Sequence, residues 1–318
     1  APGWGSCQRT QRSFQSPRRT MPIMVGSAVH FPRGRYYALT WGIPDAYGGM
    51  TRTMLHRSRA FRRPGGVEVE ILTIDDRPDY AELSDRLLAA GELVEGLRIR
   101  NLGDALRARP PKAARHAPEP VAPLVPAEGD LVAAHGGVVL LRERRDRDGG
   151  LIGADRFRRD GTILATERVV DGRRSIVLYD EAGRPLRRWR SRWALYRWWL
   201  DRVFGGRLSF LLIDSKTTAR FIPDYRRENV VTVHIVHASH RARPDAPQLR
   251  SSREDVLRRC GDFDALVVLT ERQRLDLLDD LTALGIDVHA RILVIPNGVD
   301  LPAVDPTAPA RGKGVVVA

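Results

Sequence analysis

Cysteine is almost absent from this 318-residue sequence, which contains only Cys7 and Cys260. Because the two lie far apart in the chain, the sequence excludes a disulfide framework and a cysteine-based zinc site. Long apolar runs are absent too, since none reaches the roughly 18 residues of a membrane-spanning helix. Residues 1–20 lack the continuous apolar core of a signal peptide. These absences predict a cytoplasmic protein, at most in contact with the inner face of the membrane.

Long basic runs are also missing, although the formal net charge is +13. The arginines are scattered among acidic residues, as in the stretch RERRDR at 142–147. Mixed signs of this kind are typical of solvated surfaces, and no RNA-binding signature interleaves aromatic with basic residues. We therefore expect no nucleic-acid partner, whereas the basic excess favours an anionic substrate through electrostatic steering.

Hydrophobic periodicity predicts an α/β fold with a parallel, Rossmann-like sheet. Short apolar or alternating runs follow one another with helical patterns between them, an order that requires parallel strands with covered faces. The predicted strands are 36–41, 67–74, 97–101, 208–213, 230–236, 265–269 and 292–295, with a further partial strand at 314–317. The predicted helices are 49–61, 80–90, 193–204 and 271–284, and two more begin near 214 and 251.

The stretch 155–190 breaks this order and predicts an antiparallel insertion. Short β-prone runs alternate there with turn signals at Asp160-Gly161, Asp171-Gly172 and Ala182-Gly183. Four tryptophans lie in or after it, and we interpret them as an apolar surface through which the chain forms a homo-oligomer. They are Trp189, Trp193, Trp198 and Trp199.

Glycine or polar residues follow four of the predicted parallel strands, where open α/β sheets build their clefts. The first pair is Gly48 and Gly49 at the start of a helix, where bare amide groups and the helix dipole suit a phosphate. A plain turn explains the same glycines. Asp214 and Ser215, and Thr270 and Glu271, are either substrate contacts or helix caps.

Three histidines, His234, His237 and His240, end the strand VVTVHIV or follow it. Imidazole donates and accepts protons near neutral pH, so His237 is a candidate for contact with a substrate hydroxyl or phosphate. Two alternatives remain: hydrogen-bonded structural histidines, or metal ligands. No cysteine or carboxylate cluster supports a metal site, and we expect neither a metal nor a cofactor.

Several motifs occur in an order that resembles a known family. They are the strand followed by GGM and a helix, then VHIVHASHR, FDALVVLTERQRLDL and VIPNGVD. Together they resemble the N-terminal part of family-4 glycosyltransferases of the GT-B fold, in particular the poly(glycerol-phosphate) and poly(ribitol-phosphate) α-glycosyltransferases of teichoic acid synthesis. Those relatives also carry an antiparallel insertion in this domain.

The resemblance implies a retaining transferase that moves a hexosyl group from a UDP-sugar to an anionic polymer or a protein hydroxyl. It places Gly48 and Gly49 near the donor diphosphate, and His237, as a catalytic residue, with His240 in the acceptor cleft. Asp214 and Ser215 are predicted acceptor contacts beside them. Pro296, Asn297 and Gly298 match the interdomain linker. The family's donor-binding motifs follow that linker and are missing here, so we expect the 318-residue chain alone to be inactive.

The predicted organisation is therefore a series of six segments. They are a disordered extension (1–34), the first part of a Rossmann-like domain (35–104), a Pro/Ala-rich linker that leads into the insertion (105–150), the insertion (151–191), the second part of the Rossmann-like domain (192–295), and an interdomain linker with the first strand of a further, truncated domain (296–318).

Two other classes of function compete with this prediction. A nicotinamide-dependent oxidoreductase needs G-x-G-x-x-G after the first strand, and the residues 47–52 (YGGMTR) do not match that pattern. A noncatalytic binding module for an anionic polymer needs a clustered basic face. It remains the alternative to the transferase.

Overall fold

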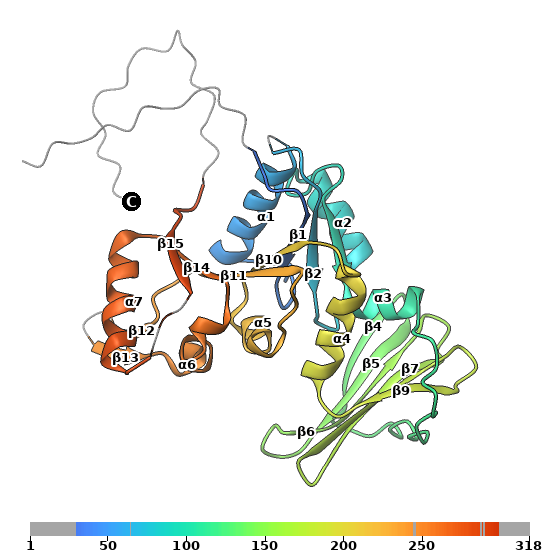
Figure 1. Ribbon diagram of the computed structural model, residues 1–318. Helices are drawn as coiled ribbons and strands as arrows, with labels where there is room; N and C mark the ends of the chain where they lie inside the picture. Colours follow the sequence, from blue (N-terminus) through green and yellow to red (C-terminus); the bar gives the residue numbers. More distant parts are fainter. Residues whose placement is uncertain (1–29, 64, 244–245, 287, 289, 299–318) are drawn as a thin grey trace, which may run out of the picture.

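The computed structural model describes residues 30–298, apart from 64, 244–245, 287 and 289. The predicted extension up to residue 29 and the predicted strand at 314–317 lie outside the described residues. Seven strands form one parallel sheet in the order β15-β14-β11-β10-β1-β2-β3 (Figure 1). Their bounds are β1 Arg35–Leu39, β2 Val69–Thr73, β3 Arg98–Asn101, β10 Ser209–Ile213, β11 Val230–Val236, β14 Ala265–Val268 and β15 Arg291–Val294.

Helices cover both faces of this sheet because successive side chains of a strand point to opposite faces. In β1, Tyr36 and Ala38 belong to one buried cluster, and Tyr37 and Leu39 belong to the other. The first cluster packs under α1 and α2, and the second under α3 to α7. The helices are α1 Gly49–Arg62, α2 Tyr80–Ala89, α3 Leu102–Ala108, α4 Arg192–Phe204, α5 Lys216–Ala219, α6 Ser251–Leu257 and α7 Glu271–Ala283, with short 3₁₀ turns at Ile222–Asp224 and Cys260–Asp262.

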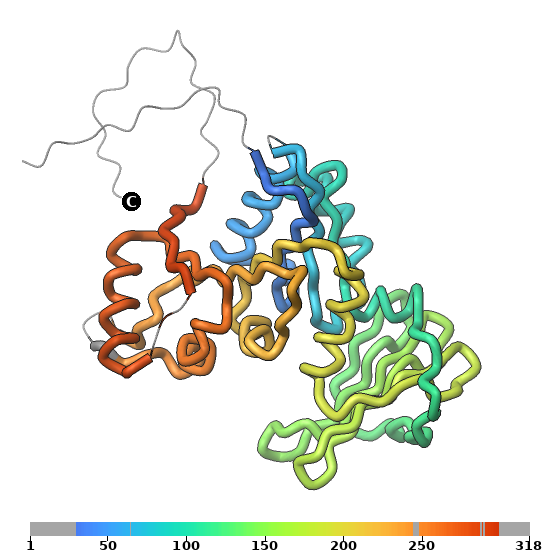
Figure 2. Tube along the Cα trace, in the orientation of Figure 1, coloured from blue at the N-terminus to red at the C-terminus, as the bar shows by residue number. Residues whose placement is uncertain are grey.

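The second large sheet is antiparallel, and its six strands are paired in chain order from β4 to β9. Figures 1 and 2 show it as a lobe of its own that meets the rest of the chain at α3 and α4. Its strands are β4 Leu131–His135, β5 Val138–Arg145, β6 Leu151–Phe157, β7 Ile163–Val170, β8 Arg173–Tyr179 and β9 Pro185–Trp189; β12 Arg241–Arg243 and β13 Ala246–Leu249 form a small separate ribbon.

The antiparallel sheet begins at Leu131, so the predicted start of the insertion at residue 151 is wrong. Gly136 and Gly137, with φ of 58° and 79°, form the turn between β4 and β5. The charged end of β5 (VVLLRERR) obscured this hairpin, because its mixed charges are also typical of a solvated surface. The turns predicted at Gly161, Gly172 and Gly183 are confirmed, with φ of 82°, 69° and 73°.

The tryptophans near the insertion are part of the core rather than an exposed surface. Trp189 and Trp199 are 7% and 3% exposed, and Trp193 and Trp198 pack against the same buried cluster. The prediction of an exposed tryptophan surface for self-association is therefore wrong, because Trp189 packs against Trp198 of α4 and Trp193 stacks on Phe221.

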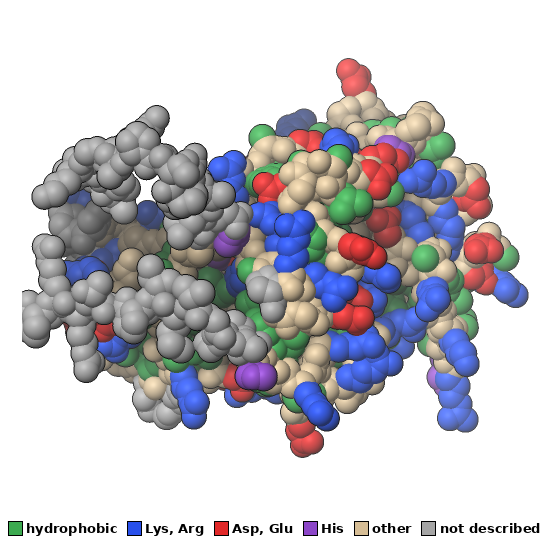
Figure 3. Space-filling model, turned by 90° about the horizontal axis from the view of Figure 1, so that it is seen from above, with side chains coloured by type: hydrophobic (Ala, Val, Ile, Leu, Met, Phe, Trp, Pro, Cys, Tyr) green, Lys and Arg blue, Asp and Glu red, His purple; other side chains and the backbone are tan. Residues whose placement is uncertain are grey.

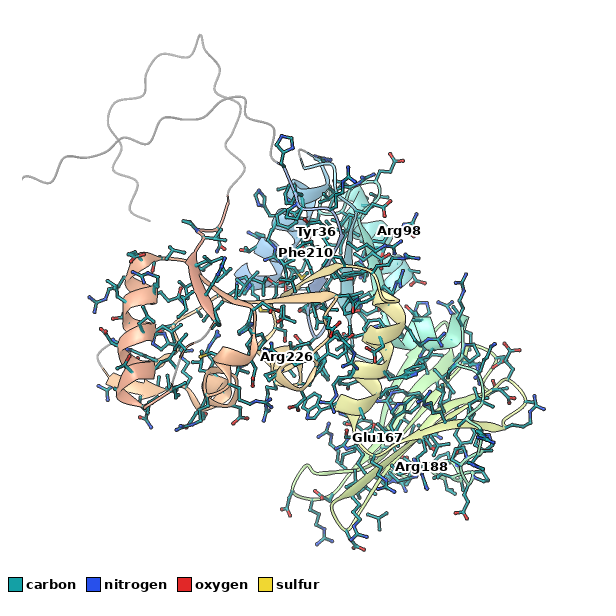
Figure 4. All side chains as sticks on the ribbon, in the orientation of Figure 1. Tyr36, Arg98, Glu167, Arg188, Phe210 and Arg226 are labelled. Atoms are coloured by element: carbon teal, nitrogen blue, oxygen red, sulfur yellow. The ribbon has the colours of Figure 1, made fainter. Side chains whose placement is uncertain are left out.

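A buried charge cluster joins the two sheets. The carboxylate of Glu167 on β7 is inaccessible to solvent and accepts hydrogen bonds from Arg156, Arg174 and Arg192. Arg156 also binds both carboxylate oxygens of Asp76, which follows β2, at 2.6 and 2.7 Å. Figure 4 labels Glu167 beside the lower end of α4. Arg156 therefore bridges the antiparallel sheet to the loop after β2.

Burial alone would raise the pKa of Glu167, but the guanidinium groups of Arg156 and Arg192 outweigh it and hold the pKa below its usual range. The carboxylate therefore stays ionised between the sheets. Removing one charged side chain from this buried cluster would leave its partners with an unpaired buried charge. We therefore expect the orientation of the antiparallel sheet relative to the parallel sheet to depend on the whole cluster.

The surface agrees with the charge pattern of the sequence. Figure 3 shows Lys and Arg side chains spread over one face with Asp and Glu side chains among them. Within the described ranges, no helix is both long enough and apolar enough to cross a membrane.

Candidate functional site

Three neighbouring strands bring the predicted site residues to one edge of the parallel sheet. Leu39 at the end of β1 is paired with Ile213 at the end of β10, and Ile213 is paired with His234 of β11. The loops that follow these strands therefore leave the sheet side by side. They carry Gly48, Asp214 and His237, as the carboxyl-edge argument predicted.

Asp214 is the centre of a cluster at this edge. Its side chain is inaccessible to solvent and accepts two hydrogen bonds from Arg57 of α1, at 3.0 Å to Oδ1 and 2.7 Å to Oδ2. Nε2 of His237 lies 2.8 Å from the same Oδ1. Burial alone would raise the pKa of Asp214, but Arg57 and His237 more than offset it and keep the pKa below its usual range.

The ionised Asp214 carboxylate orients the imidazole of His237. With Nε2 held by Asp214, Nδ1 of His237 makes no hydrogen bond within the described part of the chain. A carboxylate-bound histidine with a spare ring nitrogen can exchange a hydrogen bond or a proton with a substrate hydroxyl. The structure thus brings Asp214 and His237 together and adds Arg57, which the sequence analysis treated only as part of a helical pattern.

Gln273 on α7 fixes the loop that carries His237. Its Nε2 donates to the carbonyl oxygens of Val236 and Ala238 at 3.1 and 3.2 Å, and its Oε1 accepts from the backbone N–H of Leu269 at 2.8 Å. The hydroxyl of Thr270 accepts from the backbone N–H of Gln273 at 3.1 Å, so the helix-cap interpretation of Thr270 is confirmed. The sequence feature that could have identified Gln273 is its position three residues after the N-cap Thr270, which matches a capping-box pattern.

A cleft of about 820 Å³ opens at the ends of β1 and β2, and Ser215, the residue after Asp214, is among the residues that line it. Gly48 is the N-cap of α1, and no side chain caps the helix or places an acid in its first turn. A Cβ atom built at Gly48 or Gly49 would have no atom within 4 Å, and neither residue has a positive φ. Neither protein packing nor backbone conformation therefore requires glycine at these two positions. The first amide groups of the 14-residue helix α1 have no side-chain cap, and the residues that carry them line the cleft.

The insertion also borders this cleft. Ala133 of β4 and Leu141 of β5 line it opposite the loops of the parallel sheet. Ser215 lines it too, although its hydroxyl caps α5 by accepting from the backbone N–H of Thr217 at 3.2 Å. The hairpin that the sequence analysis assigned to a linker is thus a wall of the candidate site.

Asp75 lies in the wall of the cleft, in a tightly packed pocket. It accepts a hydrogen bond from the hydroxyl of Tyr80 at 2.6 Å, and burial raises its pKa to about 6. A Cβ atom at Gly42 would lie 2.2 Å from Oδ2 of Asp75, so only glycine fits beside this carboxylate. The sequence analysis missed Asp75 because a single Asp after a strand carries no distinctive spacing.

His240 and His234 do not join the cluster. His240 is 1% exposed, and its Nε2 lies 2.8 Å from Oδ2 of Asp280, which also binds Arg241. Its predicted role as an acceptor contact has no support in this geometry, because the loop after β11 turns His240 toward α7. His234 is buried with Nδ1 3.0 Å from the carbonyl oxygen of Ile213, and burial lowers its pKa to about 4. Both are structural histidines.

A second hollow of about 450 Å³ adjoins the first at Gly49. Arg52, His56 and Arg59 of α1 line it, together with Asn297 and Gly298. A Cβ atom at Gly298 would lie 3.1 Å from the ring of His56. The predicted linker residues therefore run beside α1. Among the described residues, no group of three or more His, Cys, Asp or Glu side chains is placed to hold a metal ion.

Comparison with known proteins identifies the fold. No family model and no curated protein matches this sequence. Solved structures do match: a point mutant of S. aureus TarM in complex with fondaparinux, α-GlcNAc-glycerol and UDP has a TM-score of 0.65 at 16% identity. The pneumococcal O-GlcNAc transferase GtfA in complex with UDP and GlcNAc has a TM-score of 0.51 at 16% identity.

The similarity to both structures extends over most of this chain. The match covers 87% of this chain and 64% of TarM, and 83% of this chain and 60% of GtfA. The chain thus spans less than two thirds of the length of either neighbour. Both neighbours are glycosyltransferases of the GT-B type. The predicted fold class, an α/β parallel sheet with a separate antiparallel sheet, agrees with them.

The raised pKa of Asp75 predicts a specific dependence of stability on pH. The folded chain holds this proton more tightly than the unfolded chain does, so wild type loses stability as the pH rises from about 4 through about 6. Asp75→Asn cannot titrate. The free energy of unfolding of the variant minus that of wild type should therefore rise between about pH 4 and pH 7, measured by urea denaturation.

Asp45→Asn is the matched control. The exposed carboxylate of Asp45 has a pKa lowered by its hydrogen bond to Arg77, so from about pH 5 upward it is ionised in both the folded and the unfolded chain. The difference in free energy of unfolding between Asp45→Asn and wild type should therefore stay constant above about pH 5. An equally flat difference for Asp75→Asn would contradict the assignment.

Proposed function

We propose that this chain is the acceptor-binding part of a retaining glycosyltransferase that moves a hexosyl group from a UDP-sugar to an anionic polyol-phosphate polymer or a protein hydroxyl. The observation that carries the proposal is the cluster of Arg57, Asp214 and His237 at the carboxyl edge of the sheet, the edge at which the loop to the uncapped α1 also leaves β1. The likeness in fold to TarM, solved with UDP and α-GlcNAc-glycerol, and to GtfA, solved with UDP and GlcNAc, supports it.

The start of α1 suits the diphosphate of the donor. Its free amide groups and the positive end of the helix dipole stabilise negative charge. In a retaining transfer, charge develops on the departing diphosphate, so groups aimed at it favour the transition state over the ground state. Gly48 and Gly49 let a phosphate approach the backbone where a side chain would stand in its way.

His237 is the proposed catalytic residue of this part of the site. Asp214 fixes its ring and leaves Nδ1 for a hydroxyl of the acceptor or of the transferred sugar. Arg57 is a positioning residue, because it acts on His237 through Asp214 and keeps that carboxylate ionised. Since the chain spans 64% of TarM, the activity is proposed for the whole enzyme, with further donor-binding residues outside this sequence.

His237→Ala and His240→Ala should separate catalysis from folding in the whole enzyme. His237→Ala should lower turnover by about 100-fold or more, as loss of a general acid–base group does, with little change in melting temperature. His240→Ala removes the buried hydrogen bond between His240 and the Asp280 carboxylate, which keeps only Arg241 as a partner, and should cost about 1–3 kcal/mol of stability while the folded fraction keeps its turnover. UDP release and thermal unfolding measure the two effects. Normal turnover in the folded His237→Ala variant would contradict the catalytic role of His237 and show that it is a structural residue.

Gly49→Ala should move stability and donor binding in opposite directions. Alanine is the better helix former by up to about 1 kcal/mol, and its methyl group meets no protein atom here. The melting temperature should therefore stay the same or rise, while the methyl group obstructs a phosphate at the amide groups and the KM for the UDP-sugar increases. An unchanged KM would place the donor diphosphate elsewhere.

A further inference from the structure

A groove of about 510 Å³ lies at the open edge of the parallel sheet, away from the cluster around Asp214. β3 is the last strand on this side of the sheet, and α3 and α4 lie close to each other there (Figure 1). The groove is formed between these three elements, with Arg100 from β3, Arg109 just after α3 and Arg202 near the end of α4 along its rim. Three guanidinium groups therefore border one hollow.

The positive charge of the three arginines is only partly neutralised by neighbouring carboxylates. Arg100 pairs with Glu70 at 2.9 Å, but no carboxylate of the described residues pairs with Arg109 or Arg202. Asp104 is the one acidic residue among those that line the groove, and it binds Arg107 at 3.1 Å. The groove thus presents unpaired positive charge, which favours an anionic ligand.

Arg202 is held in place by an aromatic ring. Its guanidinium lies 5.1 Å from the centre of the Trp198 ring, a cation–π contact that occupies its face and leaves its N–H groups at the edge available. Guanidinium groups bind phosphate oxygens in pairs, with charge-assisted hydrogen bonds. An arginine fixed in this way is prepared for a phosphate.

The floor of the groove is apolar, in contrast to its rim. Ile99, Ala105, Leu106, Trp199 and Val203 line it. A free phosphate ion would use only the rim. A chain in which phosphodiesters alternate with short carbon units fits both parts, because its charged groups meet the arginines and its carbon units lie over the apolar floor.

The groove adjoins the candidate cleft. Asn101 lines the groove, and its side-chain amide donates to the carbonyl oxygen of Asp75 at 2.9 Å. Asp75 in turn lines the cleft. One hydrogen bond therefore joins a residue that lines the groove to a residue that lines the cleft.

We propose that this groove is a binding site for a phosphodiester-linked polymer, which holds units of the acceptor remote from the one that reacts in the cleft. The proposal rests on the proposed function for the identity of the polymer. A remote site of this kind increases affinity for long acceptors without touching the reacting atoms, since the second contact becomes intramolecular once the first is made.

Binding of a defined poly(glycerol phosphate) oligomer to the 318-residue chain tests this proposal. The test variant is Arg109→Glu/Arg202→Glu. The control is Arg63→Glu/Arg207→Glu, which reverses two exposed arginines that precede β2 and β10 and do not line the groove. Calorimetric titration at several salt concentrations measures affinity, and glycerol 1-phosphate serves as the single-unit probe.

The groove variant should weaken oligomer binding by about tenfold or more and flatten its salt dependence, because charge-assisted contacts are lost. The control should change the affinity for the oligomer by less than about twofold, and the groove variant should lose more affinity for the oligomer than for glycerol 1-phosphate, which uses only the rim. Equal losses in both variants would show unspecific attraction by net charge and overturn the site. Absence of any oligomer binding by the wild-type chain would also overturn the proposed site.

Failure of the groove is distinguishable from failure of the proposed function. The groove variant leaves the Asp214 cluster intact, so the whole enzyme should keep its turnover on a single-unit acceptor. Turnover that persists with unaltered oligomer affinity refutes the groove alone, whereas an enzyme that transfers no sugar from a UDP-sugar to any such acceptor refutes the function.

Discussion

The buried carboxylate of Asp214 is the interaction on which the candidate site depends. A carboxylate without solvent contact is stable only when fixed charges and donors surround it, and here Arg57 and His237 supply them. Its backbone N–H also donates to the carbonyl oxygen of Leu39 at 3.0 Å. One residue thus ties the loop after β10 to β1, to α1 and to the loop after β11, and its negative charge sets the orientation of the His237 ring.

The antiparallel sheet is the second determinant of the site's shape. Its buried Glu167 and the bridge from Arg156 to Asp76 anchor the lobe to the loop after β2. That anchor places the first hairpin of the lobe against the cleft, where Ala133 and Leu141 form a wall. The insertion therefore contributes to the site from a distance in sequence, and its orientation depends on charges that are paired inside the molecule rather than on exposed aromatic rings.

The sequence predicted the parallel sheet well because continuous apolar runs leave few alternatives to buried strands. It also predicted that His237 and Asp214 come together, since parallel strands end at a common edge. It could not predict that Arg57 binds Asp214, because an arginine on a helix is as typical of a solvated surface as of a buried ion pair. The role given to His240 lacks support for a related reason: spacing places a histidine in a loop but does not show which way the loop turns. The hairpin from Leu131 onward was missed because its charges obscured the alternation of its strands.

Nuclear magnetic resonance of the chain labelled at histidine, titrated with the poly(glycerol phosphate) oligomer, tests the central claim most directly. The claim is that the acceptor meets the edge of the sheet where Asp214 holds His237. The ring signals of His237 should shift on binding, whereas those of His234 and His240, which are buried and bonded to Ile213 and Asp280, should not. Oligomer binding that leaves the His237 signals unchanged would contradict the account.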